Sequence, residues 1–222
     1  MCGIVGYIGP RECVDFLVQG LRRLEYRGYD SSGVVTVGAR RGPTVVKAAG
    51  RIDRLVAKLA QSPVAGTTGV GHTRWATHGP ATDENAHPHL GGDGGVAVVH
   101  NGVIENFRPL KERLQSLGYV FRSATDTEVV AHLVACRLES ELEERPVADA
   151  AAMAALGYAP LVAAVRAALG MLQGTYGLAI VFRDYPGVLI AAKLGSPLVV
   201  GVGEGEHFLA SDASAYMTGT CL

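Results

Sequence analysis

The sequence predicts an α+β fold in which β-sheets are covered by helices. Segments typical of strands alternate along the chain with segments whose apolar residues have helical spacing. The apolar runs of the strands are too continuous for sheets with one solvated face, which indicates layers buried on both sides. With 222 residues, of which 48% are hydrophobic and 18% charged, the chain is long enough to bury such a core. We expect no internal repeat and no linker that would divide it.

The predicted elements follow one another in a regular order. They are a strand at 3–8, a helix at 11–26, strands at 34–37 and 44–47, a helix at 52–59, a strand at 96–100, a helix at 107–117, a helix after Thr125, an alanine-rich helical stretch at 148–168 interrupted near Gly157 and Pro160, and strands at 176–182, 188–192, 198–202 and 207–210. Between them, residues 69–95 are expected to be rich in loops. The tetrad Thr125-Asp126-Thr127-Glu128 has the form of a capping box, which marks a helix start.

Charge and cysteine content exclude several classes of protein. The net charge is −1 with no run of Lys or Arg, so no nucleic-acid partner is expected. No apolar stretch is long enough for a membrane span, and the N-terminus lacks the features of a signal peptide. The four cysteines form no CxxC pair, which favours reduced thiols in the cytoplasm. His87-Pro88-His89 is too weak a pattern for a metal site, so no metal or other cofactor is expected.

Cys2 is the first candidate catalytic residue, because only Met1 precedes it. Removal of Met1 would leave a residue that carries both a thiol and a free α-amine. The pKa of such an amine is about 7.7–8.0 and that of a thiol about 8.5, so the amine can take the thiol proton at neutral pH. From this position alone, an ordinary buried strand cysteine remains the alternative.

Three further places carry polar residues suited to a binding site. Residues 72–79 (HTRWATHG) combine two histidines, an arginine and two threonines, and Arg74 has the planar fork that fits a carboxylate; the alternative is a solvated loop. Asn101 and the Gly102 N–H, at a strand end, could donate to an oxyanion; the alternative is an Asn-Gly turn. Asp126 could bind an ammonium group; the alternative is that its charge only interacts favourably with the dipole at the helix N-terminus.

With these residues identified, the chain resembles the glutaminase domains (class II glutamine amidotransferases) of the glucosamine-6-phosphate synthase family. The matching stretches are Cys2 to Gly6, Leu24 to Gly33, Gly71 to Gly79, His100 to Asn106 and Asp126 to Glu128. They cover most of the chain to about Leu138, with weaker agreement onward to Asp212. The resemblance implies a four-layer αββα sandwich of the N-terminal-nucleophile hydrolase type, formed by residues 1–222 as one amidotransferase domain.

The resemblance also implies a role for each candidate residue. Cys2 would be the nucleophile and its α-amine the base, with Asn101 and Gly102 forming the oxyanion hole. Arg74, Thr77 and His78 would surround the α-carboxylate of glutamine, and Asp126 would bind its α-ammonium group. Trp75 would belong to the loop that closes over glutamine, and Arg27 would support the pocket structurally. The implied reaction is hydrolysis of the L-glutamine side-chain amide through a thioester, with no cofactor.

The family's synthases pass the ammonia to fructose 6-phosphate in a sugar isomerase region that this chain lacks. The chain is therefore expected to be a fragment, monomeric by itself and part of a homodimer in the full-length enzyme. Residues 139–160 are interpreted as a surface insertion. Two alternatives remain: another N-terminal-cysteine amidohydrolase, and a silent glutamine-binding module in which Met1 is retained.

Overall fold

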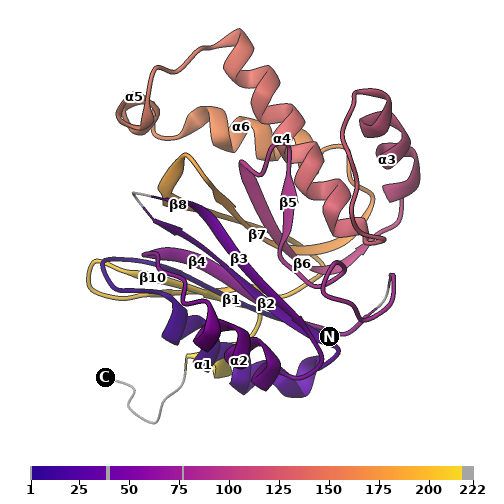
Figure 1. The fold of residues 1–222 in the computed structure, drawn as a ribbon. Helices are drawn as coiled ribbons and strands as arrows, with labels where there is room; N and C mark the ends of the chain where they lie inside the picture. The colour runs from indigo at the N-terminus through magenta and orange to yellow at the C-terminus, as the bar shows by residue number, and fades with distance from the viewer. Residues whose placement is uncertain (1, 39–40, 77, 217–222) are drawn as a thin grey trace.

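Two β-sheets packed face to face, with helices on both outer faces, make up the molecule (Figure 1). The computed structural model describes residues 2–38, 41–76 and 78–216. The first sheet has six strands in the order β3-β2-β4-β1-β10-β9, and the second has four in the order β5-β6-β7-β8. All the named strand pairs within these residues are antiparallel. The predicted α+β fold with four layers, αββα, is confirmed.

The two halves of the sandwich draw their elements from different parts of the chain. The first sheet and its helices consist of β1 (Gly3–Ile8), α1 (Val14–Leu24), β2 (Ser31–Gly38), β3 (Arg41–Ala49), α2 (Ile52–Gln61), β4 (Thr68–Arg74), β9 (Val199–Val202) and β10 (His207–Ala210). The second sheet and its helices consist of β5 (His89–Gly91), β6 (Val96–Ile104), α3 (Phe107–Ser116), α4 (Asp126–Glu144), α5 (Ala150–Ala155), α6 (Ala159–Leu169), β7 (Gly174–Phe182) and β8 (Tyr185–Leu194). None of the helices in the described part of the chain is both long and apolar enough to cross a membrane.

Alternate side chains of one strand enter different apolar layers. Val5 and Tyr7 of β1 pack with α1, whereas Ile4, which precedes Val5, packs against the second sheet. Successive strand residues point to opposite faces, so a strand buried on both faces is apolar throughout. The layer between the sheets consists of Ile4, Val35, Val37, Val70, Ala97, Val99, Ala179, Val181 and Leu209. This alternation is why the continuous apolar runs predicted the layers correctly.

The prediction of a loop-rich segment at residues 69–95 is wrong at its start. Residues 68–74 form β4, which lies between β2 and β1 in the first sheet. Glycines obscured the strand, and they are needed where α1 crosses it. A Cβ at Gly69 would lie 2.8 Å from Cys13 Sγ, and one at Gly71 would lie 2.9 Å from Leu21 Cδ1. Glycine within a strand marks such close approach.

Strand β6 is longer than predicted and contains Asn101 and Gly102. The strand continues to Ile104, so the alternative of an Asn-Gly turn is wrong. Gly102 has φ +133°, and a Cβ there would lie 2.1 Å from the Thr175 carbonyl oxygen. Only glycine fits a backbone that takes this conformation so close to its neighbouring strand.

The N-terminus of α4 is capped in a modified form of the predicted box. Thr125 Oγ1 accepts the Glu128 N–H at 3.4 Å, as expected. The Glu128 carboxylate, however, accepts the N–H groups of Arg122 and Ser123, at 2.8 and 2.7 Å, instead of that of Thr125. The cap therefore also fixes the loop that precedes the helix.

The interpretation of residues 139–160 as a surface insertion is only partly correct. Most side chains between α4 and α6 are exposed, but Met153 of α5 is fully buried in the core between the second sheet and its helices. The predicted interruption of the helices is confirmed, since Gly157 and Tyr158 both have positive φ, +58° each.

Candidate active site

A cavity of about 390 Å³ lies where the N-terminal end of β1 meets the second sheet. Its walls come from distant parts of the chain: Cys2, Arg27, Arg74, Trp75, His87, His100, Asn101, Gly102, Val103, Thr125, Asp126, Thr127, Thr175, Ser196 and Pro197. Of the predicted site residues it contains Cys2, Arg27, Arg74, Trp75, Asn101, Gly102 and Asp126. Thr77 lies outside the described residues, and His78 is not part of the wall.

The thiol of Cys2 is held against the end of β4. Its Sγ accepts the backbone N–H of Trp75 at 3.2 Å. Burial raises the pKa of this thiol, while the Trp75 hydrogen bond and the charge of Arg74 act in the opposite direction. Because burial has the larger effect, the thiol needs a nearby base to form the thiolate. The thiol therefore already has a backbone donor that would stabilise its thiolate.

Arg74 brings a positive charge to the cavity without an acidic partner. Its side chain is buried, and its guanidinium donates to the carbonyl oxygens of His78, Gly79 and Pro80, the last two at 3.3 Å. Among the described residues no carboxylate forms an ion pair with it. Burial lowers the pKa of Arg74, which shows how poorly the charge is solvated. Such a buried cation favours an anionic ligand such as a carboxylate.

Asp126 supplies a buried negative charge at the N-terminus of α4. Its Oδ2 accepts the Ile104 N–H at 2.8 Å and lies 3.9 Å from His100 Nδ1. Within the described chain, its Oδ1 has no hydrogen bond. The carboxylate is 4% exposed and lines the same cavity as Arg74. A ligand with one carboxylate and one ammonium group would match this pair of charges.

The side-chain amide of Asn101 lies beside Cys2. Its Nδ2 donates to the Cys2 carbonyl oxygen at 2.9 Å, and its Oδ1 lies 3.0 Å from His72 Nε2. Gly102 follows it in β6 and also lines the cavity. The arrangement places an amide donor in the same cavity as the thiol, where it could stabilise the oxyanion that attack at a carbonyl carbon would form.

The other predicted residues surround this centre in different ways. Trp75 is 48% exposed, and its ring meets that of Tyr29 edge to face at 5.6 Å. Arg27 donates to Asp212 Oδ2 at 2.8 Å and so joins the end of the N-terminal helical region to the C-terminal segment. The ring of His78 packs on Phe107, with centroids 5.3 Å apart.

Sequence reasoning named His72, His87 and His89 but did not predict that they lie buried together with His100 at the cavity and behind it. His72, His87, His89 and His100 are at most 5% exposed, and His87 stacks on His72 with centroids 4.2 Å apart. His87 Nδ1 accepts the His100 N–H, and His89 Nε2 bonds to Thr125 Oγ1. The available signal was that His72 belongs to the 72–79 motif and that His87 and His89 flank one proline, but neither pattern shows that these side chains meet.

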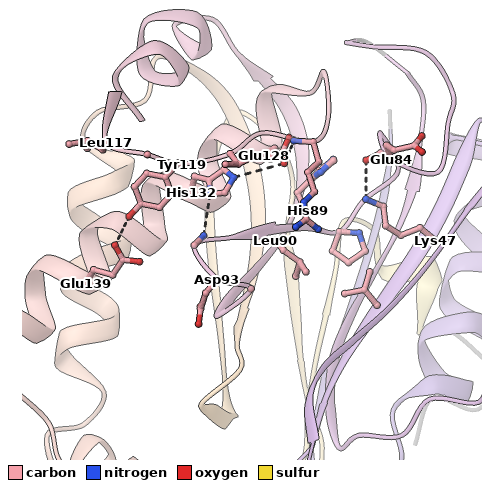
Figure 2. A pocket seen from close by; sticks show the side chains of 17 residues that line it. Lys47, Glu84, His89, Leu90, Asp93, Leu117, Tyr119, Glu128, His132 and Glu139 are labelled. Carbon is pink, nitrogen blue, oxygen red and sulfur yellow. Dashed lines mark hydrogen bonds and ion pairs between the residues drawn. The ribbon is translucent and has the colours of Figure 1, made fainter. Parts of the chain in front are cut away.

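A second, larger cavity of about 650 Å³ opens between β3, β5 and α4 (Figure 2). Lys47 reaches it from β3 and donates to the Glu84 carbonyl oxygen at 3.0 Å, and burial lowers the pKa of this amine to about 8. On the other side, His132 Nδ1 accepts the Gly92 N–H at 3.1 Å. Among the described residues, no thiol or hydroxyl nucleophile other than the Tyr119 phenol lines this cavity, and that phenol donates to Glu139. The first cavity is therefore the candidate active site.

Comparison with known proteins agrees with the chemistry of the first cavity. A family model described as a glutamine amidotransferase domain matches residues 59–144. The chain is 50% identical over 221 residues to glutamine–fructose-6-phosphate aminotransferase (isomerizing) of Streptomyces coelicolor, covering 99% of this chain and 33% of that protein. It is also 50% identical over 217 residues to the protein of the same name from Thermococcus kodakarensis, covering 98% and 33%. The chain thus spans about a third of the length of these relatives.

The fold is shared with a solved amidotransferase. Glutamine phosphoribosylpyrophosphate amidotransferase from B. subtilis, in complex with ADP and GMP, superimposes with a TM-score of 0.74 at 27% identity. The match covers 97% of this chain and 43% of that one. The two sheets and their helices are therefore an arrangement that an amidotransferase uses.

Proposed function

Because the chain belongs to the family of class II glutamine amidotransferase domains, we propose that it hydrolyses the side-chain amide of L-glutamine with Cys2 as the nucleophile. The observation that carries this proposal is that the Cys2 thiol, a buried cation, Arg74, and a buried carboxylate, Asp126, line the same cavity. A free amino acid offers the two complementary charges.

The substrate is oriented by its α-carbon groups. We assign its α-carboxylate to Arg74, whose guanidinium has only carbonyl partners among the described residues. Its α-ammonium is assigned to Asp126, where Oδ1 remains free for it within the described chain. In this proposal Thr77 and His78 belong to the carboxylate site, and Trp75 closes over the substrate. His78 acts from outside the cavity wall, through its carbonyl oxygen, which accepts a hydrogen bond from Arg74. Together these contacts select a free amino acid over a peptide amide.

The reaction proceeds in two steps. The Cys2 α-amine, exposed by loss of Met1, takes the thiol proton, and the thiolate attacks the amide carbon of glutamine. The Asn101 Nδ2–H and the Gly102 N–H stabilise the negative oxygen of the tetrahedral intermediate. The C–N bond then breaks, the amine returns its proton to the leaving nitrogen, and ammonia departs. Water next attacks the γ-glutamyl thioester, which releases glutamate and restores the thiol. No cofactor takes part in this scheme.

Ammonia is the product that a larger protein would use. The relatives named above are about three times as long as this chain. We propose that the ammonia passes to fructose 6-phosphate in a sugar isomerase region of a longer protein, giving glucosamine 6-phosphate. A free thiol as nucleophile favours the reducing cytoplasm as its location.

The test is glutamate release from L-glutamine by the purified chain, with the mass of its N-terminal peptide recorded. Activity in the parent with Met1 removed, and none in Cys2→Ala, is the expected result. The matched control is Cys136→Ala, a thiol far along α4 that is outside the cavity. Equal activity in parent and Cys2→Ala would overturn the proposed mechanism. Silence of a folded parent that has lost Met1 would overturn the proposed activity for this chain.

A further inference from the structure

His72 connects the two sheets directly behind the reacting centre. It lies in β4 of the first sheet and is fully buried. Its Nε2 is 3.0 Å from the His100 carbonyl oxygen and 3.0 Å from Asn101 Oδ1, both in β6 of the second sheet. His72 itself does not line the cavity, so it has no direct contact with a substrate there.

The partners of His72 fix which ring nitrogen carries the proton. A carbonyl oxygen and an amide oxygen can only accept, so Nε2 must be the donor to both. Burial lowers the pKa of His72 to about 3, which leaves the ring neutral with its single proton on Nε2. His87 stacks on the ring with an interplanar angle of 28° and holds its plane.

This donor determines the orientation of the Asn101 amide. With Oδ1 on His72 Nε2–H, the two Nδ2 hydrogens face the other way, and one of them binds the Cys2 carbonyl oxygen at 2.9 Å. The flipped amide would set NH₂ against an N–H donor and oxygen against the Cys2 carbonyl oxygen. Both contacts would then be repulsive, because donors would meet donors and acceptors would meet acceptors.

We propose that His72 is a positioning residue for glutamine hydrolysis, which holds the Asn101 amide with its N–H donors turned toward the oxyanion that forms beside Cys2. This inference rests on the proposed function. Without the histidine donor, only the Cys2 carbonyl oxygen still orients the amide, so the flipped form, with its oxygen toward the developing negative charge, is populated for part of the time. The consequence is a weaker interaction in the transition state, with the binding of ground-state glutamine unchanged.

The experiment is a double-mutant cycle between His72→Leu and Asn101→Ala, with glutamate release as the readout. His72→Leu should lower kcat roughly 100-fold or more, as loss of one oxyanion donor does, with KM within threefold. In the Asn101→Ala background, the same substitution should cause no further loss, because its effect passes through the amide. His72→Gln, which keeps an N–H donor on a side chain of similar length, should recover most of kcat.

A binding measurement separates positioning from general disturbance of the site. The γ-aldehyde analogue of glutamate adds to a thiol as a tetrahedral hemithioacetal, whereas glutamate itself mimics the ground state. In His72→Leu, the Kd of the aldehyde should rise by the factor by which kcat/KM falls, with the Kd of glutamate unchanged. His132→Leu is the matched control: this histidine is also buried, but it lines the second cavity and should leave kcat unchanged (Figure 2).

The outcomes distinguish this inference from the function on which it rests. A parent chain that releases no glutamate overturns the proposed function. If the parent is active, any of three results overturns only the role of His72. These are losses that multiply in the double mutant, an unchanged aldehyde Kd in His72→Leu, and a His72→Gln variant as slow as His72→Leu.

Discussion

Mild acid should destabilise this protein strongly, because its buried histidines must stay neutral in the fold. Burial lowers the pKa of His72 to about 3 and sets the pKa values of His87 and His89 well below 6.5. In the unfolded chain, the histidines have unperturbed pKa values of about 6.5. Below that pH the unfolded state therefore binds more protons than the native state, and stability must fall as the pH is lowered.

The size of the effect at pH 5.0 depends only on the unfolded pKa, provided that the native pKa lies well below 5. Each such histidine then costs RT ln(1 + 10^1.5), which is about 2 kcal/mol. His72, with a native pKa of about 3, therefore removes about 2 kcal/mol of the 5–15 kcal/mol that typical domains possess, and His87 and His89 act in the same direction. His100 should contribute less, because the Asp126 carboxylate opposes the effect of burial on its pKa.

The sign and the pH window separate this effect from that of the carboxylates. Histidines with a lowered native pKa contribute stability that is complete above about pH 6.5 and is lost as the pH falls from there toward the native pKa. The pKa values of Asp83, Asp93 and Asp212 are lowered from 3.8 by their hydrogen bonds. Their contribution is lost only below about pH 4, outside the window from pH 7.5 to 5.0.

Urea unfolding followed by far-UV circular dichroism at pH 7.5, 6.5, 5.5 and 5.0 measures the effect. The free energy of unfolding should fall by more than about 2 kcal/mol over this range, and in His72→Gln the fall should be about 2 kcal/mol smaller. A free energy that stays constant within 1 kcal/mol, or a pH dependence identical in the parent and His72→Gln, would refute the reasoning.

Three substitutions test other parts of the site. Gly102→Ala places a Cβ 2.1 Å from the Thr175 oxygen at a φ of +133°, so it should cost about 1–3 kcal/mol in thermal unfolding and slow glutamate release; an unchanged Tm and kcat would contradict this. Asp126→Asn removes a charged hydrogen bond worth about 1.5–3 kcal/mol, so KM for glutamine should rise about 10- to 100-fold. Alkylation of Cys2 by iodoacetamide should stay within twofold in that variant, and an equal loss there would count against the assignment. Arg74→Lys keeps the charge but loses the fork that reaches the carbonyl oxygens, so KM should rise more than kcat falls; an unaltered KM would show that the fork is dispensable.

The layered fold could be predicted because its signal is local. A strand between two apolar layers needs apolar residues at successive positions, as the Val5 and Ile4 side chains of β1 illustrate. Strand β4 was missed for the opposite reason. Its glycines are required by α1, which crosses the sheet above them, and that requirement depends on a contact between distant segments.

The site was only partly visible in the sequence. Cys2 and Arg74 could be proposed from the sequence alone. A thiol next to the chain start and an arginine within a polar cluster suggest a chemical role without knowledge of the fold. The role inferred for His72 could not be proposed in this way, because it depends on the packing of β4 against a strand of the other sheet. Asn101 was proposed as a donor at a strand end, and only the Thr175 carbonyl oxygen, from a distant part of the chain, explains why Gly102 must follow it.

The sheet order explains how the proposed nucleophile can lie so close to the start of the chain. Chain ends usually fray, which would be fatal to a catalytic group at residue 2. Here β1 is an inner strand between β4 and β10, and pairing of Gly3 with Thr73 brings the residue before it to the end of β4. On the other side, Ser211 exchanges hydrogen bonds of 3.0 Å with the backbone of Ile4. The first strand is thus held along both edges, so Cys2 gains the fixed position of a core residue while its thiol faces the cavity.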